Sequence, residues 1–246
     1  MNRPNNNRIG STGSLKNKSQ TMLRPQSQIT NGLRALGQQF RRDELAYLAL
    51  TQKPEHVLRD RLAFEIHRTL PEGDPSLCVC REWKRVDMAI LKDNVPLALL
   101  EAKAFYTFDL RSKNVAAKYL GPNGYIMKDI CKARATAARY VGSGTVAPPE
   151  TYALVFATNT LERPNIQFRQ PIKYFNQVVK YSRDRISFEE AGRIVCGHLG
   201  CCSLVESCRF EAGVAFGVKV ELFGWLLQSR HRPSLRTNPI ASGNPR

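Results

Sequence analysis

The stretch that decides the fold reads RVDMAILKDNVPLALLEAKAF over residues 85–105. Two apolar runs of strand length, 85–91 and 95–105, stand on either side of Asp93 and Asn94, which are residues that favour tight turns. A third run of strand length covers 76–83 just before them. Together the three runs predict a meander of three neighbouring strands.

Three charged residues lie inside these apolar runs. Asp87 is in the second run, while Glu101 and Lys103 are two residues apart in the third and therefore point to one face of the sheet. Removing an unpaired charge from water costs several kcal/mol. We expect such residues only where they pair with one another, bind a metal ion or line a hydrated cleft.

The register of the hairpin decides whether Asp87 meets Glu101. A two-residue turn at 93–94 leaves Asp87 opposite Leu100 and puts Glu101 on the other face. A three-residue loop, or one bulge, shifts the pairing by one position and sets Asp87 directly opposite Glu101. Pro96 has no amide hydrogen and is compatible with the looser arrangement.

The rest of the chain alternates between helical and strand periodicity. Helices are expected over 31–51, 54–70, 125–141, 171–183 and 187–198, and further strands over 151–158 and within 208–225. The 151–158 run is typical of a strand that is buried on both faces. The predicted fold class is therefore α/β (mixed), a central sheet flanked by helices with extra C-terminal strands.

Size and hydropathy bound the classes of protein. The chain has 246 residues, of which 42% are apolar, enough to bury a core in a single domain over 30–228. No apolar run approaches the ~20 residues needed to cross a bilayer, so the sequence excludes a membrane-spanning protein.

The charge is strongly basic and unevenly spread. Lys and Arg total 37 against 21 Asp and Glu, a net charge of +16, and no acid precedes Asp43 or follows Glu221. The terminal segments 1–29 and 229–246 are predicted to be disordered basic tails, either simply solvated or acting as arms that attract phosphate. An acidic partner is expected, and nucleic acid is the commonest one.

Seven cysteines bear on the compartment and on zinc. Their odd number disfavours a complete disulfide set, and the polar N-terminal segment lacks the apolar core of a secretory signal, so a reducing, cytoplasmic environment is expected. Cys196, His198, Cys201, Cys202 and Cys208 are zinc-type ligands without a pair of CxxC motifs. Buried thiols are therefore preferred over structural Zn²⁺.

At Asp87, Glu101 and Lys103 the chain resembles the PD-(D/E)xK, or restriction endonuclease-like, nuclease superfamily. The core of that superfamily is a helix, a three-stranded meander, a helix and a strand, with Asp in the second meander strand and Glu-x-Lys in the third. The resemblance covers residues 54–158. The chain departs from it at Val86, where many members have Pro, and in the following helix, which lacks the Gln of the exonuclease subgroup.

The resemblance implies hydrolysis of phosphodiester bonds with Mg²⁺ or Mn²⁺, most simply by a DNA endonuclease. Asp87, Glu101 and the backbone carbonyl of Ala102 would hold the ion, because Mg²⁺ prefers hard oxygen ligands. Lys103 would orient the attacking water or stabilise the developing negative charge.

Further residues are implied around this centre. A carboxylate from the first core helix often joins the site, and Glu65 is the first candidate and Asp60 the second. Lys128, Lys132 and Arg134, on the helix after the motif, are candidate phosphate contacts. The expected substrate is DNA rather than RNA, and a homodimer or a larger complex stays open.

Two other interpretations remain open. Asp87, Glu101 and Lys103 would also suit a structural ion-pair cluster at a sheet edge. The whole chain would also suit a non-catalytic nucleic-acid-binding or scaffold protein on the same or another mixed fold.

Overall fold

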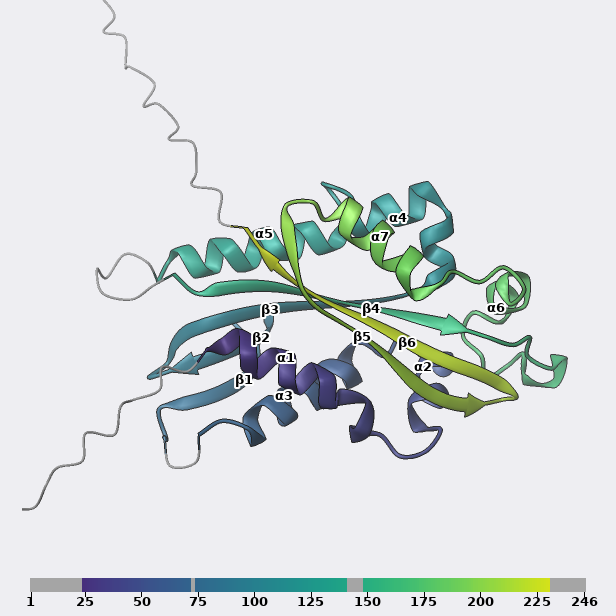
Figure 1. The fold of residues 1–246 in the computed structure, drawn as a ribbon, viewed down its shortest axis with the longest axis horizontal. Coiled ribbons are helices and arrows are strands. Elements are labelled where there is room, and N and C mark those ends of the chain that lie inside the picture. The colour runs from purple at the N-terminus through teal and green to yellow at the C-terminus, as the bar shows by residue number, and fades with distance from the viewer. Residues whose placement is uncertain (1–23, 72–73, 141–147, 231–246) are drawn as a thin grey trace, which may run out of the picture.

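The fold is built around one six-stranded sheet, shown in a computed structural model that describes residues 24–71, 74–140 and 148–230 (Figure 1). The strands lie in the order β1-β2-β3-β4-β6-β5. β3 and β4 are parallel and all other neighbours are antiparallel. The strands are β1 (Leu77–Trp83), β2 (Val86–Lys92), β3 (Val95–Tyr106), β4 (Glu150–Thr160), β5 (Cys202–Ala215) and β6 (Val218–Ser229). The predicted mixed α/β class is confirmed.

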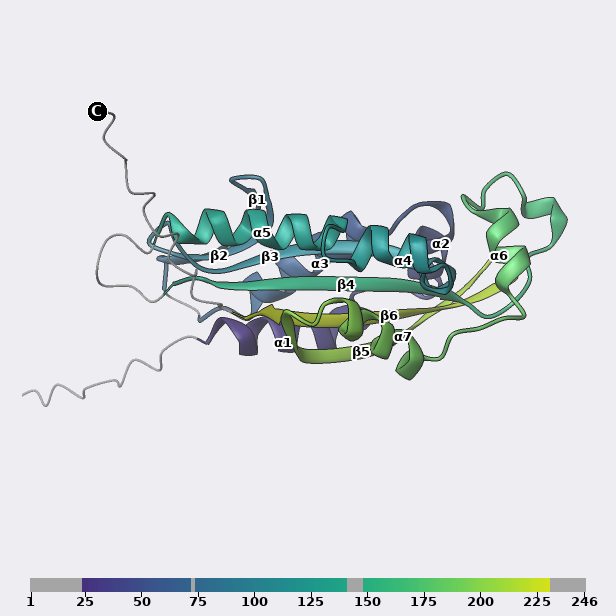
Figure 2. The same ribbon diagram turned by 90° about the horizontal axis from the view of Figure 1, so that it is seen from above.

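Helices cover both faces of this sheet, and Figures 1 and 2 show the resulting layers. On one face lie α1 (Pro25–Ala35), α2 (Glu44–Thr51) and α3 (Glu55–Arg68), and on the other lie α4 (Lys113–Leu120), α5 (Tyr125–Ala138) and α7 (Phe188–His198). α6 (Phe175–Tyr181) lies beyond one end of the sheet. Each face has its own apolar core, and β4 is buried on both, as its apolar run predicted.

The β2–β3 hairpin has the bulged register. The turn holds only Asp93 and Asn94, both with left-handed backbone, at φ 51° and 63°. A bulge then shifts the pairing, so that Ile90 faces Ala98 and Met88 faces Leu100. The same register, carried one residue further, sets Asp87 opposite Glu101.

Several predicted elements are confirmed to within a few residues at each end. These are the three meander strands, the 54–70 and 125–141 helices, the 151–158 strand and the 187–198 helix. Ser187 caps the last of these helices by accepting a hydrogen bond from the Glu190 amide. The region within 208–225 belongs to the β5–β6 hairpin.

The N-terminal region differs from the prediction. The continuous helix over 31–51 is wrong, because Asp43 has a left-handed backbone, at φ 63°, and separates α2 from α1 and a short 3₁₀ turn. The predicted N-terminal tail, 1–29, extends too far into the chain, because α1 begins at Pro25 and Ile29 is fully buried. The remainder of both predicted tails, 1–23 and 231–246, lies outside the described residues.

Two further differences concern short helices. α4 was not predicted, and the helix expected over 171–183 is confined to α6. Within the described ranges, no helix is long and apolar enough to span a membrane.

Candidate functional site

The candidate site lies where β3 runs on past the start of β2. The β2–β3 ladder pairs Met88 with Leu100, whereas β3 continues to Tyr106. The amides of this edge that β2 does not pair donate to side chains instead. The Ala102 amide donates to Asp87 Oδ2 at 2.8 Å, and the Ala104 amide donates to Glu55 Oε2 at 3.0 Å. Two carboxylates are thereby fixed along the edge of one strand.

Asp87 and Glu101 converge on the face of the sheet that α5 covers. Glu101 is 4% exposed, and its pKa is raised to about 8 by burial, by the charge of Asp87 and by a hydrogen bond with the Asp87 carboxyl. Glu101 Oε1 has no hydrogen-bond partner among the described residues, since Lys132 Nζ stays 4.0 Å away. The pair therefore contains a buried oxygen that accepts no hydrogen bond, which we call open.

Lys103 lies beside this pair and is held by two other carboxylates. Its Nζ is 3.0 Å from Asp129 Oδ2 on α5 and 3.4 Å from Glu55 Oε1 on α3. Burial alone would lower the pKa of Lys103, but the charges of Glu55 and Asp129 outweigh it and raise the pKa. The ammonium is therefore positive at neutral pH and fixed in position.

Arg59 joins α3 to the same site. The Arg59 guanidinium is buried, lies 3.4 Å from Asp87 Oδ1 and also pairs with Glu82 and with Asp60.

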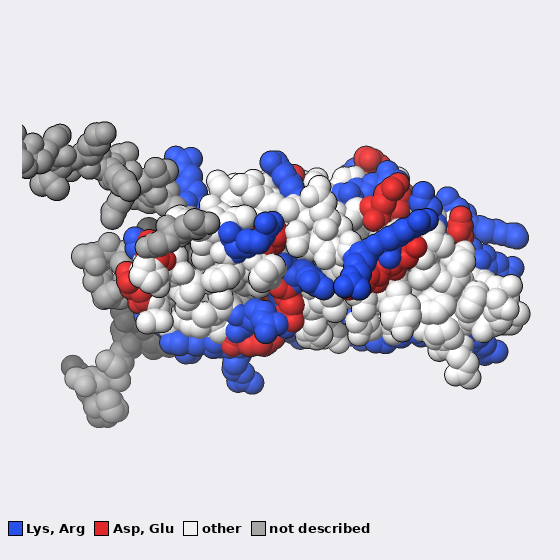
Figure 3. Space-filling view, turned by 90° about the horizontal axis from the view of Figure 1, so that it is seen from below, with Lys and Arg blue, Asp and Glu red and all other residues white. Residues whose placement is uncertain are grey.

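Figure 3 views the side of the molecule that carries α1 and α3, where basic and acidic side chains lie next to one another. This mixed charge does not favour extended phosphate binding on that side.

Of the two acids proposed on the first core helix, neither lies at the centre of the site. Glu65 is buried and pairs with Arg68 Nη2 at 2.6 Å. Glu65 is ten residues beyond Glu55, which is about 15 Å along a helix. Asp60 pairs with Arg59 and Arg81. The acid that α3 brings to Lys103 is Glu55, at its first turn.

The basic residues of α5 divide between its two flanks. Lys132 lies over Glu101 and donates to the Arg85 carbonyl, which ties α5 to the start of β2. Lys128 is exposed one turn earlier, on the same flank. Arg134 lies on the other flank, where its charge acts on Cys202 of β5. Lys128 and Lys132 are thus on the side of the site and Arg134 is not.

Sequence reasoning missed Glu55 and Asp129. Glu55 looks like the ordinary acidic residue of a helix first turn, and Asp129 like one charge on a solvated helix face. One signal was available for Asp129, because it shares a helix flank with Lys132, three residues later. Nothing in the sequence alone distinguishes Glu55.

The residues present fit a hard divalent cation. Asp87 and Glu101 supply carboxylate oxygens, and the Ala102 carbonyl points to the same strand edge as its amide, toward Asp87. Across the described ranges, no group of three or more His, Cys, Asp or Glu residues is arranged to hold a metal ion. A cation here would therefore keep several waters, as Mg²⁺ usually does.

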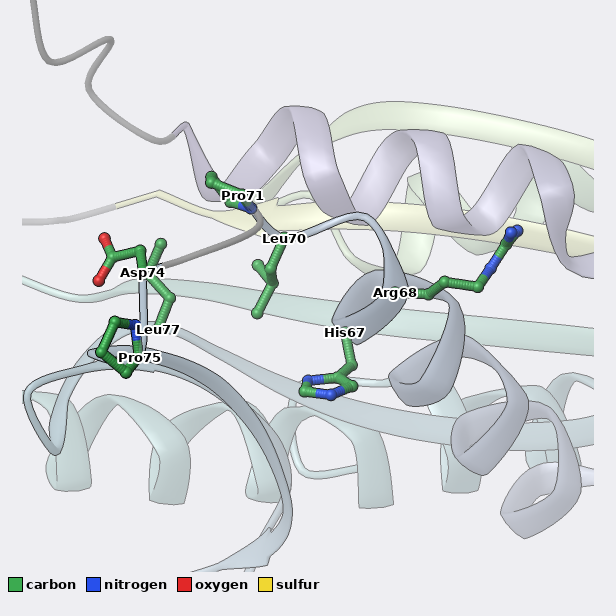
Figure 4. A pocket seen from close by; sticks show the side chains of 7 residues that line it. All are labelled: His67, Arg68, Leu70, Pro71, Asp74, Pro75 and Leu77. Carbon is green, nitrogen blue, oxygen red and sulfur yellow. The ribbon is translucent and has the colours of Figure 1, made fainter. Parts of the chain in front are cut away.

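Other candidate regions lie elsewhere. All seven cysteines are described and are free thiols, and Cys201 Sγ and Cys202 Sγ are 3.7 Å apart. An open cleft lies at the Leu77 end of β1, the end remote from Asp87, and Figure 4 shows its lining side chains. It is lined by His67, Arg68, Leu70, Pro71, Asp74, Pro75 and Leu77. None of the predicted site residues borders this cleft.

Comparisons of the chain with protein-family models, with curated proteins and with solved structures find no match. A function therefore has to be inferred from the geometry of the site.

Proposed function

We propose that the chain is a metal-dependent nuclease of the PD-(D/E)xK type that hydrolyses phosphodiester bonds, with DNA as the expected substrate. The observation that carries this proposal is the convergence of Asp87 and Glu101, with an open oxygen on Glu101 and a fixed Lys103 beside them. Two converging carboxylates, of which Glu101 is buried and Asp87 half-buried, are expected where a cation joins them.

The order of elements supports the same proposal. α3, the β1–β2–β3 meander, α5 and β4 come in this order along the chain, with α4 inserted before α5, and β4 is parallel to β3. This is the helix, meander, helix and strand order that the resemblance implies for a restriction endonuclease-like core.

The chain's own residues have separable roles in this reaction. Asp87 and Glu101 would hold the cation, which would neutralise charge on the scissile phosphate and lower the pKa of a water. Lys103 places a positive charge where negative charge develops on the phosphate, and Glu55 and Asp129 position its ammonium. The resemblance implies a 5′-phosphate and a 3′-hydroxyl as the products.

The test is incubation of the full chain with circular and linear DNA, in Mg²⁺ and in EDTA. We expect cleavage in Mg²⁺ only, and none with Asp87→Asn. Glu211→Gln is the control, because its side chain is 81% exposed on β5. Nicking of circular DNA indicates an endonuclease, and a parallel arm with single-stranded RNA tests the sugar preference.

Lys103→Ala separates catalysis from binding. Its loss should lower cleavage about 100-fold or more, because a positioned charge acts on the transition state. DNA affinity should change little, since many phosphate contacts determine it. Normal cleavage by this variant would make Lys103 a structural residue.

One observation favours the alternative, a non-catalytic nucleic-acid-binding or scaffold protein. Lys103 and Asp87 both have protein partners, as members of a structural ion-pair network would. DNA binding without cleavage in Mg²⁺ or Mn²⁺ would support this alternative and reject the nuclease.

A further inference from the structure

Three aromatic side chains form a row beside the carboxylate site. Phe105 lies on β3, two residues after Lys103 and on the same face. Its ring centroid is 5.8 Å from that of Tyr119 on α4, which is 5.7 Å from that of Tyr125 at the start of α5. The row therefore leads from the strand that carries Glu101 to the first turn of the helix that covers it.

Two segments of the chain connect this row to the site. Lys53 Nζ donates to the Tyr119 hydroxyl at 3.0 Å and lies 4.9 Å from the Tyr119 ring centroid. Lys53 is two residues before Glu55, which contacts Lys103. At the other end, Tyr125 precedes Asp129 by one helical turn, about 6 Å along the axis. The segments that hold the Tyr119 and Tyr125 rings therefore also hold the Lys103 ammonium.

The row is buried at one end and accessible at the other. Phe105 is 1% exposed, Tyr119 is partly buried and Tyr125 is 43% exposed. Lys118 Nζ lies 5.7 Å from the Tyr125 ring centroid, at a surface position where an incoming planar group can replace it. A supported ring with an exposed end and lysines on both sides is the chemistry that holds an unpaired base and its phosphates.

We propose that Tyr125, supported by Tyr119, is a stacking platform for an unpaired base of a nucleic acid strand, with Lys53 and Lys118 contacting its phosphates. A duplex hides the faces of its bases, so a tyrosine ring can stack only on a base that is unpaired. Where the strand continues to Lys103 and the carboxylates, its phosphate is the one that the proposed nuclease would cut, and that part rests on the proposed function. The substrate class is then nucleic acid with a single-stranded segment at the cleaved position.

Binding in EDTA tests the platform without any cleavage. The probes are a single-stranded oligonucleotide containing 2-aminopurine and its fully paired duplex, followed by fluorescence anisotropy and by 2-aminopurine quenching. We expect tighter binding of the single strand, with quenching. Tyr125→Ala should weaken that binding by about 5- to 100-fold, the loss of one stacked base, and remove the quenching. Tyr125→Phe should retain both.

The matched control is Tyr47→Ala, which removes a tyrosine that is 52% exposed on α2, on the opposite side of the sheet. Tyr125→Leu keeps apolar contact with Tyr119 without an aromatic face and replaces Tyr125→Ala if the alanine variant melts early. Unchanged single-strand affinity in the ringless variants, or equal binding of duplex, overturns the platform. If binding depends on Tyr125 but the chain cleaves nothing, the platform is supported and the nuclease is rejected. If the chain cleaves and neither binding nor cleavage depends on Tyr125, the nuclease is supported and the platform is rejected.

Discussion

Two buried glutamates on the same face of the sheet have opposite surroundings. Glu101 on β3 and Glu221 on β6 are each 4% exposed. Glu221 Oε2 accepts a hydrogen bond from Asn159 Nδ2 at 3.2 Å, and Oε1 accepts from the Arg209 guanidinium, with Nε at 3.1 Å. Glu101 faces another carboxylate, Asp87, and its Oε1 accepts no hydrogen bond in the described structure, with Lys132 Nζ 4.0 Å away.

The difference separates a structural charge from a candidate functional one. The network around Glu221 is closed, because Asn159 Oδ1 also accepts a hydrogen bond from Thr107 Oγ1 at 3.0 Å. The group around Glu101 is incomplete without a proton or a cation. A buried carboxylate therefore does not mark a site by itself, whereas an unsatisfied one beside a second carboxylate does.

The largest expected effect is the loss of cleavage in Glu101→Gln. The amide keeps the shape of the side chain but removes the negative charge that would bind the cation. We expect the rate of DNA cleavage to fall at least about 100-fold, since a catalytic metal supplies several kcal/mol of transition-state stabilisation. The measurement is the initial rate in saturating Mg²⁺.

The same substitution should leave the fold intact at neutral pH, where Glu101 is mostly protonated, and make it more stable at higher pH, where it removes the repulsion between two ionised carboxylates. Glu221→Gln is the isosteric control and should retain cleavage in the folded fraction. Equal loss of cleavage in both variants would remove the distinction between the two glutamates.

The second prediction compares the same two variants by their stability instead of their cleavage, and here Glu221→Gln should show the larger loss. In Glu221→Gln one oxygen becomes an amide group that donates, although Arg209 and Asn159 both already donate to this side chain. One buried donor then loses its acceptor, which costs about 1–3 kcal/mol of unfolding free energy. Urea denaturation measures it. A Glu101→Gln variant that is destabilised as much as Glu221→Gln would show that the Glu101 oxygen is not open in solution.

The meander and its register were predictable because buried strands restrict their own pairing. A slip of one residue moves every side chain to the other face, so burying Met88 and Leu100 together forces Asp87 and Glu101 together. The Asp93-Asn94 turn alone pointed to the wrong register. The bulge next to Pro96 corrects it, and the pairing of Asp87 with Glu101, the separation of apolar from charged side chains and the missing amide hydrogen of Pro96 favoured that alternative.

The helical side of the site was less predictable. Apolar periodicity shows which face of a helix is buried, but not which strand edge meets its first turn. Glu65, at the edge of the apolar stripe, was therefore the first candidate, while the residue that reaches the Ala104 amide is Glu55. The break at Asp43 was missed because a left-handed Asp leaves no trace in periodicity.

The third prediction concerns pH and metal together. The pKa of Glu101 is raised from its ordinary 4.5 to about 8, so the folded chain binds a proton that the unfolded chain has released. This group's contribution to stability is complete below about pH 4.5 and is lost as pH rises toward 8. The melting temperature of the unaltered chain, relative to Glu101→Gln, should therefore fall over that range.

At pH 8, Mg²⁺ should raise the melting temperature of the unaltered chain relative to that of Glu101→Gln, because a cation that binds the ionised pair stabilises the folded state by mass action. Thermal melts with Mg²⁺ and with EDTA, in both proteins, measure this. A Mg²⁺-induced shift that is the same size in Glu101→Gln would place the bound cation elsewhere.

The smallest expected effect concerns the two flanks of α5. One flank faces Asp87 and Glu101, and the other faces β5. Lys128 and Lys132 share the flank over Glu101, whereas Arg134 lies near Cys202. Lys128→Ala should weaken DNA binding a few-fold and reduce the slope of log K against log salt by about 0.9, the loss of one phosphate contact. Arg134→Ala removes the same charge from the same helix and should leave that slope unchanged.

Lys128 is a better probe than Lys132, because Lys132 also donates a hydrogen bond to the Arg85 carbonyl and its loss would alter the site itself. Equal slopes for the two variants would mean that DNA does not follow the flank of α5 that covers Glu101. The strand would then have to reach the carboxylates from the side of the β1–β2 turn.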